Sequence, residues 1–248
     1  MLENLLKPVV FAHRGASQYA PENTIAAFDL AVSQGADAIE LDVKLSADGK
    51  AVVIHDQTVD RTTDGSGRVD HIKLQDLKKL NAQYRFDTYT GERIPTLDEV
   101  FESVGKRIFI NVELTNYATR NDDLVPVVAE IVKRHQLSKE VLFSSFVPGN
   151  LKKIKTLLPG VPVALLASQG ILGITSRSAL FTQLSPNIIH PYVKDVNQRY
   201  MNIERKRGRR VHVWTVNEEI DLRRLIALGV DGFFTDDPVK ALRILERK

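Results

Sequence analysis

Short runs of β-branched and aliphatic residues alternate with helical patterns along the whole chain, and this alternation restricts the fold more than any other feature. It predicts eight strands, at residues 9–12, 38–43, 107–113, 141–145, 161–166, 187–190, 210–216 and 232–235. Helical patterns separate them, such as those at 23–34, 96–104, 122–135, 218–228 and 238–247. Eight strands that are each followed by a helix predict a parallel sheet closed into an α/β TIM barrel.

Composition supports one large soluble domain without a nucleic-acid partner. The 248 residues are 43% apolar and 26% charged, which allows either one barrel or two smaller domains by length alone. The net charge is only +3, and the basic run 205–210 is more typical of a helix end and loop than of a nucleic-acid surface, because no aromatic residues interleave it. Cysteine is absent, which excludes disulfides and zinc–thiolate sites.

The apolar segments are too short for stable membrane insertion, since a spanning helix needs about 18 apolar residues or more. The first ten residues lack the apolar core of a signal peptide. We therefore expect a cytoplasmic protein.

A hairpin and a long irregular segment interrupt the repeat. Asp48-Gly49 between two apolar runs is a strong hairpin signal, so we assign 51–55 to a strand that folds back on 38–43. A two-residue turn at Asp48 and Gly49 would place His55 beside Asp42. The segment 57–95 is too long for a plain loop, and we expect it to form a small inserted subdomain on the catalytic face of a single domain that covers residues 1–248.

Three carboxylates point to a divalent cation. Glu40 and Asp42 are two residues apart in a predicted strand, so both side chains leave the same face, where buried acids need a counter-ion. The predicted strand at 107–113 adds Glu113, with Asn111 two residues earlier on the same face. An all-oxygen set favours Mg²⁺ or Ca²⁺ over zinc.

Two histidines and an arginine are candidates for the chemistry. His13 and Arg14 follow the first predicted strand, and barrel active sites lie at strand C-termini. Because His55 is expected near the same carboxylates, we interpret His13 as a catalytic residue rather than as a structural hydrogen-bonding one. The planar guanidinium of Arg14 suits either a phosphate or an ordinary ion pair, and beside a histidine we favour phosphate.

Other polar and aromatic residues give weaker signals. Residues 21–24 are interpreted as mainly structural, with Asn23 or Thr24 as a helix N-cap. His190, at a strand end, is a candidate for the pocket lining, whereas His212, in mid-strand, is expected to pack in the interior. Trp214 near the top of the seventh predicted strand is interpreted equally as substrate-binding wall and as core.

Together these residues resemble the bacterial glycerophosphodiester phosphodiesterases, a family of the phosphatidylinositol-phospholipase-C-like barrels. The resemblance covers nearly the whole chain. Its motifs are His13-Arg14-Gly15, Pro21-Glu22-Asn23-Thr24, Gly35-Ala36-Asp37, Glu40-Leu41-Asp42-Val43, Asp48-Gly49, His55-Asp56, Arg61-Thr62-Thr63, Ile94-Pro95-Thr96-Leu97, Asn111-Val112-Glu113-Leu114, Val213-Trp214-Thr215-Val216-Asn217 and Thr235-Asp236-Asp237-Pro238. Each motif is weak alone, but their order makes the match specific.

The resemblance implies that Glu40, Asp42 and Glu113 hold one divalent cation and that His13 and His55 are the acid–base pair. The implied reaction is hydrolysis of a small-molecule glycerophosphodiester to glycerol 3-phosphate and an alcohol. The glycerol hydroxyl next to the phosphate would attack first, and water would open the cyclic product. The alternatives are a phosphodiesterase for lysolipid headgroups and a barrel that binds phosphodiesters without cleaving them.

One position departs from the family pattern. The family commonly has lysine two residues after the third metal carboxylate, where this chain has Thr115. If the position is simply vacant, Thr115→Lys should raise kcat/KM. If another basic residue reaches the phosphate instead, the added lysine should lower it.

Overall fold

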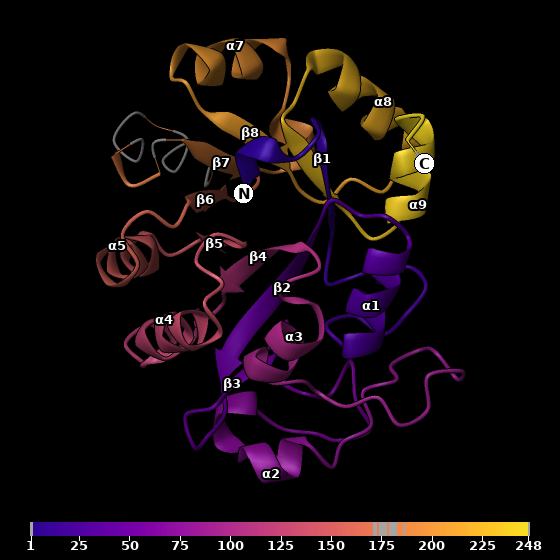
Figure 1. The fold of residues 1–248 in the computed structure, drawn as a ribbon, viewed down its shortest axis with the longest axis vertical. Coiled ribbons are helices and arrows are strands. Elements are labelled where there is room, and N and C mark those ends of the chain that lie inside the picture. Colours follow the sequence, from indigo (N-terminus) through magenta and orange to yellow (C-terminus); the bar gives the residue numbers. More distant parts are fainter. Residues whose placement is uncertain (1, 171–172, 174–177, 179–182, 186, 248) are drawn as a thin grey trace.

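Residues 2–170, 173, 178, 183–185 and 187–247 are described in the computed structural model of the chain. Within this part, eight parallel strands close into a barrel in the order β1-β2-β4-β5-β6-β7-β8-β9, because β1 pairs with both β2 and β9 (Figure 1). The strands are β1 (Val9–Ala12), β2 (Ala38–Leu45), β4 (Phe109–Leu114), β5 (Val141–Ser145), β6 (Val163–Ala167), β7 (Ile188–Pro191), β8 (Arg210–Val213) and β9 (Gly232–Thr235). The predicted TIM barrel is confirmed, with strand ends shifted by up to three residues.

Helices lie outside the barrel, between successive strands and, for the last helix, after the final strand (Figure 1). They are α1 (Ile25–Ser33), α3 (Leu97–Val104), α4 (Leu124–His135), α5 (Pro148–Leu157), α7 (Gln198–Lys206), α8 (Glu219–Leu228) and α9 (Pro238–Ile244). A short 3₁₀ helix, Leu2–Asn4, precedes β1, and another, Val193–Asp195, follows β7. Thr24, rather than Asn23, caps α1, and Thr96 caps α3 in a reciprocal capping box with Glu99.

The barrel interior follows the two-residue period of its strands. Alternate residues point inward, and a buried apolar cluster that includes Phe11, Ala38, Phe109, Leu142 and Phe234 fills the N-terminal half. Farther along β2 and β4 the same inward positions carry polar residues. The apolar layer therefore forms a floor beneath the polar end of the barrel.

The basic run at 205–210 is a helix end and loop, as expected, but it is not wholly solvated. It continues from the last turn of α7 into β8, and Arg209 is buried against Glu204. Among the described residues, no helix combines the length and apolarity needed to cross a membrane.

The hairpin after β2 differs from the prediction by one residue. The strand β3 (Ala51–Val53) pairs antiparallel with β2 so that Leu45 faces Ala51. The Ser46 N–H donates a backbone hydrogen bond to Lys50 O at 2.9 Å, and this bond closes the hairpin. The loop has three residues and ends at Gly49, whose φ of +71° suits glycine. Ile54, and not His55, therefore lies opposite Asp42 in the ladder.

The segment 57–95 packs around this hairpin (Figure 1). It contains a 3₁₀ turn, Val69–His71, and the short helix α2 (Leu74–Leu77). Apolar side chains of the segment bury against the far side of β3 in a small cluster separate from the barrel core, made of Val52, Ile54, Val59, Val69, Leu77, Ala82 and Ile94. This packing holds the segment beside the C-terminal end of the barrel.

Candidate active site

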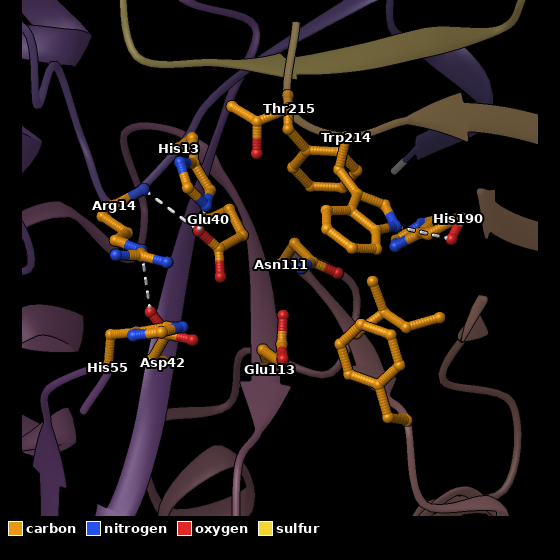
Figure 2. A pocket seen from close by; sticks show the side chains of 13 residues that line it. His13, Arg14, Glu40, Asp42, His55, Asn111, Glu113, His190, Trp214 and Thr215 are labelled. Carbon is orange, nitrogen blue, oxygen red and sulfur yellow. Dashed lines mark hydrogen bonds and ion pairs between the residues drawn. The ribbon is translucent and has the colours of Figure 1, made fainter. Parts of the chain in front are cut away.

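A cavity of about 110 Å³ opens at the C-terminal ends of the strands (Figure 2). All seven residues that the sequence analysis selected for catalysis, substrate binding or metal binding line it: His13, Arg14, Glu40, Asp42, His55, Glu113 and Trp214. They come from β2 and β4 and from the segments that follow β1, β3 and β8. The fold therefore brings together side chains that are about 200 positions apart in the sequence.

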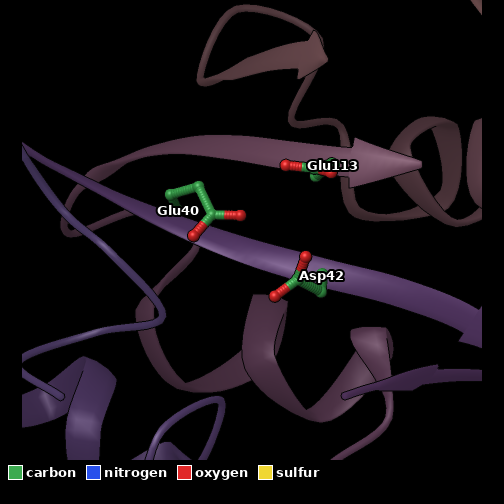
Figure 3. A group of neighbouring side chains, drawn as sticks. All are labelled: Glu40, Asp42 and Glu113. Carbon is green, nitrogen blue, oxygen red and sulfur yellow. The ribbon is translucent and has the colours of Figure 1, made fainter. Parts of the chain in front are cut away.

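Three carboxylates gather in this cavity. One oxygen each from Glu40, Asp42 and Glu113 lie within 4.8 Å of one another (Figure 3). Glu40 and Asp42 are only 2% and 1% exposed. Burial and the neighbouring acids raise the pKa of Glu40 well above its usual range, and burial together with Asp42 raises the pKa of Glu113 to about 8. The cluster favours a proton or a cation between these oxygens.

Asp42 behaves differently from its two neighbours. Burial acts to raise its pKa, but the Arg14 guanidinium, His55 and the Asn23 amide lower it overall. Arg14 Nε lies 3.3 Å from Asp42 Oδ2, and Asn23 Nδ2 donates a 3.0 Å hydrogen bond to the same oxygen. Asp42 is therefore held as a carboxylate in a fixed orientation.

The turn after β1 aims Arg14 into the cavity. Its backbone has a φ of +56°, and its N–H donates to Glu40 Oε2 at 3.0 Å. Gly15 follows with a φ of +82°, and an added Cβ there would lie 2.6 Å from the backbone of Ala27 on α1. The close approach of the turn to α1 explains why glycine follows the arginine.

His13 is held from behind by the end of β9. Its Nδ1 lies 2.6 Å from Asp236 Oδ1, and its Nε2 lies 4.0 Å from Glu40 Oε2 on the cavity side. Asp236 also accepts from Asn217 Nδ2 at 2.6 Å and from Ser17 at 3.2 Å. Burial acts to raise the pKa of Asp236, but the contacts with His13 and Asn217 lower it to about 2. This carboxylate orients the imidazole and keeps Nε2 facing the carboxylate cluster.

A second chain of charges orients His55. Its Nδ1 lies 2.6 Å from Asp56 Oδ1, and Asp56 accepts from Arg61 Nε at 2.6 Å. Arg61 also bonds Glu22, which in turn accepts from Arg14 Nη1 at 2.8 Å. Although the predicted hairpin register is wrong, His55 still reaches the cavity, because the chain leaves β3 before it. Arg61 therefore links the 57–95 segment to His55 through Asp56 and to Arg14 through Glu22.

Aromatic side chains form the opposite wall. Trp214 Nε1 donates to the carbonyl of His190 at 2.8 Å, and its ring meets Phe146 edge to face at 5.6 Å. His190 also lines the cavity, whereas His212 is buried behind it and does not. The ring of Trp214 thus presents carbon atoms to the cavity, because its only polar atom is already paired.

Lys44 lies two residues after Asp42 on β2, and its side chain contacts Thr115. Its buried ammonium donates to Thr115 Oγ1 at 2.8 Å and to Thr115 O at 3.0 Å. Burial lowers the pKa of Lys44, while Asp42 and Glu113 act to raise it. A lysine side chain therefore lies beside residue 115, although it does not line the cavity of the three carboxylates.

The residues that orient the histidines and the arginine were not predicted from the sequence. Asp56 and Asp236 stand in the quoted motifs, and their signal was an acid placed just after a strand end or beside a histidine. Glu22 and Asn23 contact Arg14 and Asp42, although the 21–24 segment was interpreted as mainly structural. Lys44 continues the two-residue spacing of Glu40 and Asp42, and this spacing predicts that it lies on the same face of the strand.

The chain is similar to known proteins along most of its length. The glycerophosphoryl diester phosphodiesterase family matches residues 13–240. A glycerophosphodiester phosphodiesterase from Caldanaerobacter subterraneus subsp. tengcongensis is 37% identical over 98% of this chain and 99% of its own length. Another, from Bacillus subtilis, is 35% identical over 95% of this chain and 86% of its own length.

Solved structures agree with this match. A phosphodiesterase from Oleispira antarctica, in complex with the product sn-glycerol-3-phosphate, has a TM-score of 0.89 at 31% identity and covers 96% of this chain and 97% of that chain. Because relatives above 30% identity cover the chain nearly end to end, this chain belongs to the glycerophosphoryl diester phosphodiesterase family and is an enzyme of that family.

Proposed function

We propose that the protein hydrolyses small-molecule glycerophosphodiesters to glycerol 3-phosphate and an alcohol, with His13 and His55 as the acid–base pair. The observation that carries this proposal is that both imidazoles line one cavity with the three-carboxylate cluster. Each imidazole has its Nδ1 against a carboxylate, which leaves Nε2 to exchange protons with the substrate.

Glu40, Asp42 and Glu113 are proposed to hold one divalent cation, Mg²⁺ or Ca²⁺. The donor set fits such an ion, because it is made of carboxylate oxygens that lie close together. Burial, together with the neighbouring acids, raises the pKa values of Glu40 and Glu113, and a bound cation would offset the cost of their negative charges. When bound, the cation would supply Lewis-acid polarisation of the phosphodiester.

The remaining side chains bind and orient the substrate in this proposal. Arg14 contacts the phosphodiester oxygens with N–H groups that its ion pair with Glu22 leaves free, and Trp214 covers the carbon chain. One histidine removes the proton of the glycerol hydroxyl next to the phosphate, and this oxygen attacks phosphorus. The other histidine protonates the leaving alcohol, and water then opens the cyclic diester.

We also propose that residues 1–248 form one barrel domain in which 57–95 is an inserted subdomain. Its separate apolar cluster supports the assignment, as does the contact of Arg61 with Glu22 and Asp56. The insertion would then support the catalytic face rather than form an independent unit.

A panel of glycerophosphodiesters assayed with Mg²⁺, Ca²⁺ and EDTA tests the whole proposal. We expect release of glycerol 3-phosphate with a divalent cation, loss of activity in EDTA and recovery when the cation is restored. Binding of the diesters without turnover under any condition would favour a non-catalytic barrel. Faster cleavage of lysophospholipids than of water-soluble diesters would favour the lysolipid alternative.

A further inference from the structure

Apart from Arg14 Nε, which forms an ion pair with Asp42, two buried polar atoms of the cavity have no hydrogen-bond partner among the described residues. They are Asn111 Oδ1 and His190 Nδ1, and their residues are 1% and 0% exposed. Both residues line the cavity of the carboxylate cluster. Buried polar atoms in proteins almost always have a hydrogen-bond partner. Two such atoms without a partner in one cavity therefore indicate a ligand group that forms hydrogen bonds with both.

The Asn111 amide is oriented by its neighbour on β5. Asn111 Nδ2 donates to Ser144 Oγ at 2.9 Å, which turns Oδ1 away from Ser144. Figure 2 shows Asn111 between Glu113 and Trp214, with its oxygen directed away from Glu40 toward the aromatic wall. A carbonyl oxygen only accepts hydrogen bonds, so the ligand must present a donor here.

The His190 ring is also held in place. Its Nε2 faces His212 Nδ1 at 3.3 Å, and its ring packs against Phe234 at a centroid distance of 4.9 Å. Burial lowers the pKa of His190 well below its usual range, so the ring is neutral and Nδ1 either donates or accepts. A ligand hydroxyl that donates its single proton to Asn111 Oδ1 can still accept from Nδ1–H of His190, the tautomer in which His190 Nε2 accepts from His212 Nδ1.

A hydroxyl group meets these requirements, whereas an anionic oxygen does not. A carboxylate or phosphate oxygen would face the Asn111 oxygen acceptor to acceptor, without a proton between them. The neighbouring Trp214 has its N–H paired and offers a carbon surface for the methylene beside such a hydroxyl. The subsite therefore fits the end of a short polyol.

We propose that Asn111 and His190 bind the terminal hydroxyl of the glycerol moiety, the one that is not adjacent to the phosphate. This inference rests on the proposed function. His13, Arg14 and His55 lie together on one side of the cavity, and His190 and Trp214 lie on the other (Figure 2). A glycerol whose phosphate and attacking hydroxyl lie near the histidine pair would extend its far end toward Asn111 and His190.

The first test compares two substrates on the unaltered protein. The pair is sn-glycero-3-phosphocholine and the matching choline phosphodiester of propane-1,2-diol, which keeps the hydroxyl next to the phosphate and lacks only the terminal one. We expect kcat/KM to be at least about 10²-fold higher for the glycerol diester, because the deoxy analogue leaves two buried polar atoms unpaired. This comparison needs no variant to fold.

The second test uses Asn111→Leu and His190→Phe, which keep side-chain bulk and, at 190, the ring contact with Phe234. Each should lower kcat/KM for the glycerol diester and leave that for the propanediol diester within a few-fold, so that the preference falls toward one. His71→Phe, an exposed histidine outside the cavity, is the matched control and should keep the preference. Calorimetry with glycerol 3-phosphate and propane-1,2-diol phosphate should show the same loss of discrimination without turnover.

Several results would overturn the inference. Equal kcat/KM for the two diesters on the unaltered protein would refute the subsite while the proposed function stands. Retained preference in both variants would mean that other residues bind the terminal hydroxyl. Loss of divalent binding in Asn111→Leu would assign Asn111 to the cation instead. Hydrolysis of neither diester would refute the proposed function, and this inference with it.

Discussion

Replacement of Asp236 by asparagine tests how the end of β9 controls His13. The Asn217 side chain is locked at this site, because its Oδ1 accepts from the Asp236 N–H at 2.9 Å. Its Nδ2 must therefore donate to residue 236, as it does at 2.6 Å. An asparagine at 236 must keep its oxygen toward Asn217 and turn its NH₂ toward His13. The neutral imidazole then accepts at Nδ1 and carries its proton on Nε2.

The effect on catalysis follows from this reversal. A neutral His13 with its proton on Nε2 cannot accept a proton there, and it could give that proton up only by becoming an imidazolate anion. Loss of a charge-assisted hydrogen bond, worth about 1.5–3 kcal/mol, corresponds to roughly 10- to 100-fold. With the wrong tautomer added, we expect Asp236→Asn to lower kcat by at least about 10²-fold.

The assay is steady-state hydrolysis of a glycerophosphodiester at saturating divalent cation, with ¹⁵N NMR of the histidine side chains to read the tautomer of His13. The matched control is Asp237→Asn, because Asp237 accepts from Lys240 N at the start of α9 and does not contact His13. The control should keep kcat within a few-fold. Near-normal kcat in Asp236→Asn, or an unchanged His13 tautomer, would refute the reasoning.

Four further predictions concern the cation, the second histidine and the residue 115 position. Glu113→Ala should abolish divalent-cation binding in calorimetric titration without changing the circular dichroism of the fold, and unaltered affinity would exclude Glu113 as a ligand. Because the pKa of Glu113 is raised to about 8, the cation displaces protons below that pH, so its affinity should fall as pH decreases from 8 to 6; a pH-independent affinity would contradict this. His55→Ala should lower kcat by at least about 10²-fold with the cation still bound, and activity within a few-fold would exclude it from the mechanism. Thr115→Lys should lower kcat/KM, because the new ammonium meets that of Lys44, and an increase would show that the position is functionally vacant.

Local sequence patterns were enough to predict most of the fold and most of the residues that line the cavity. The two-residue period of a strand places Glu40 with Asp42, and Asn111 with Glu113, on one face whatever the rest of the chain does. Alternation of strand and helix favours a parallel sheet, and eight repeats favour closure, so the polar strand ends had to gather at one rim. These inferences depend on backbone geometry that acts over a few residues.

The contacts between side chains across the barrel depend on the tertiary structure and could not be predicted from local sequence patterns. Asp236 reaches His13 from 223 positions away, because closure of the barrel pairs β1 with β9. The hairpin register differs by one residue from the one that the turn motif predicts, and the hairpin loop forms hydrogen bonds with the 57–95 segment, from Leu74 N to Asp48 and from Ala47 N to Ile72 O. Lys44 took the place beside Thr115 through the pairing of β2 with β4. Hydrogen-bond partners across strands depend on closure and register, which no local pattern of residues specifies.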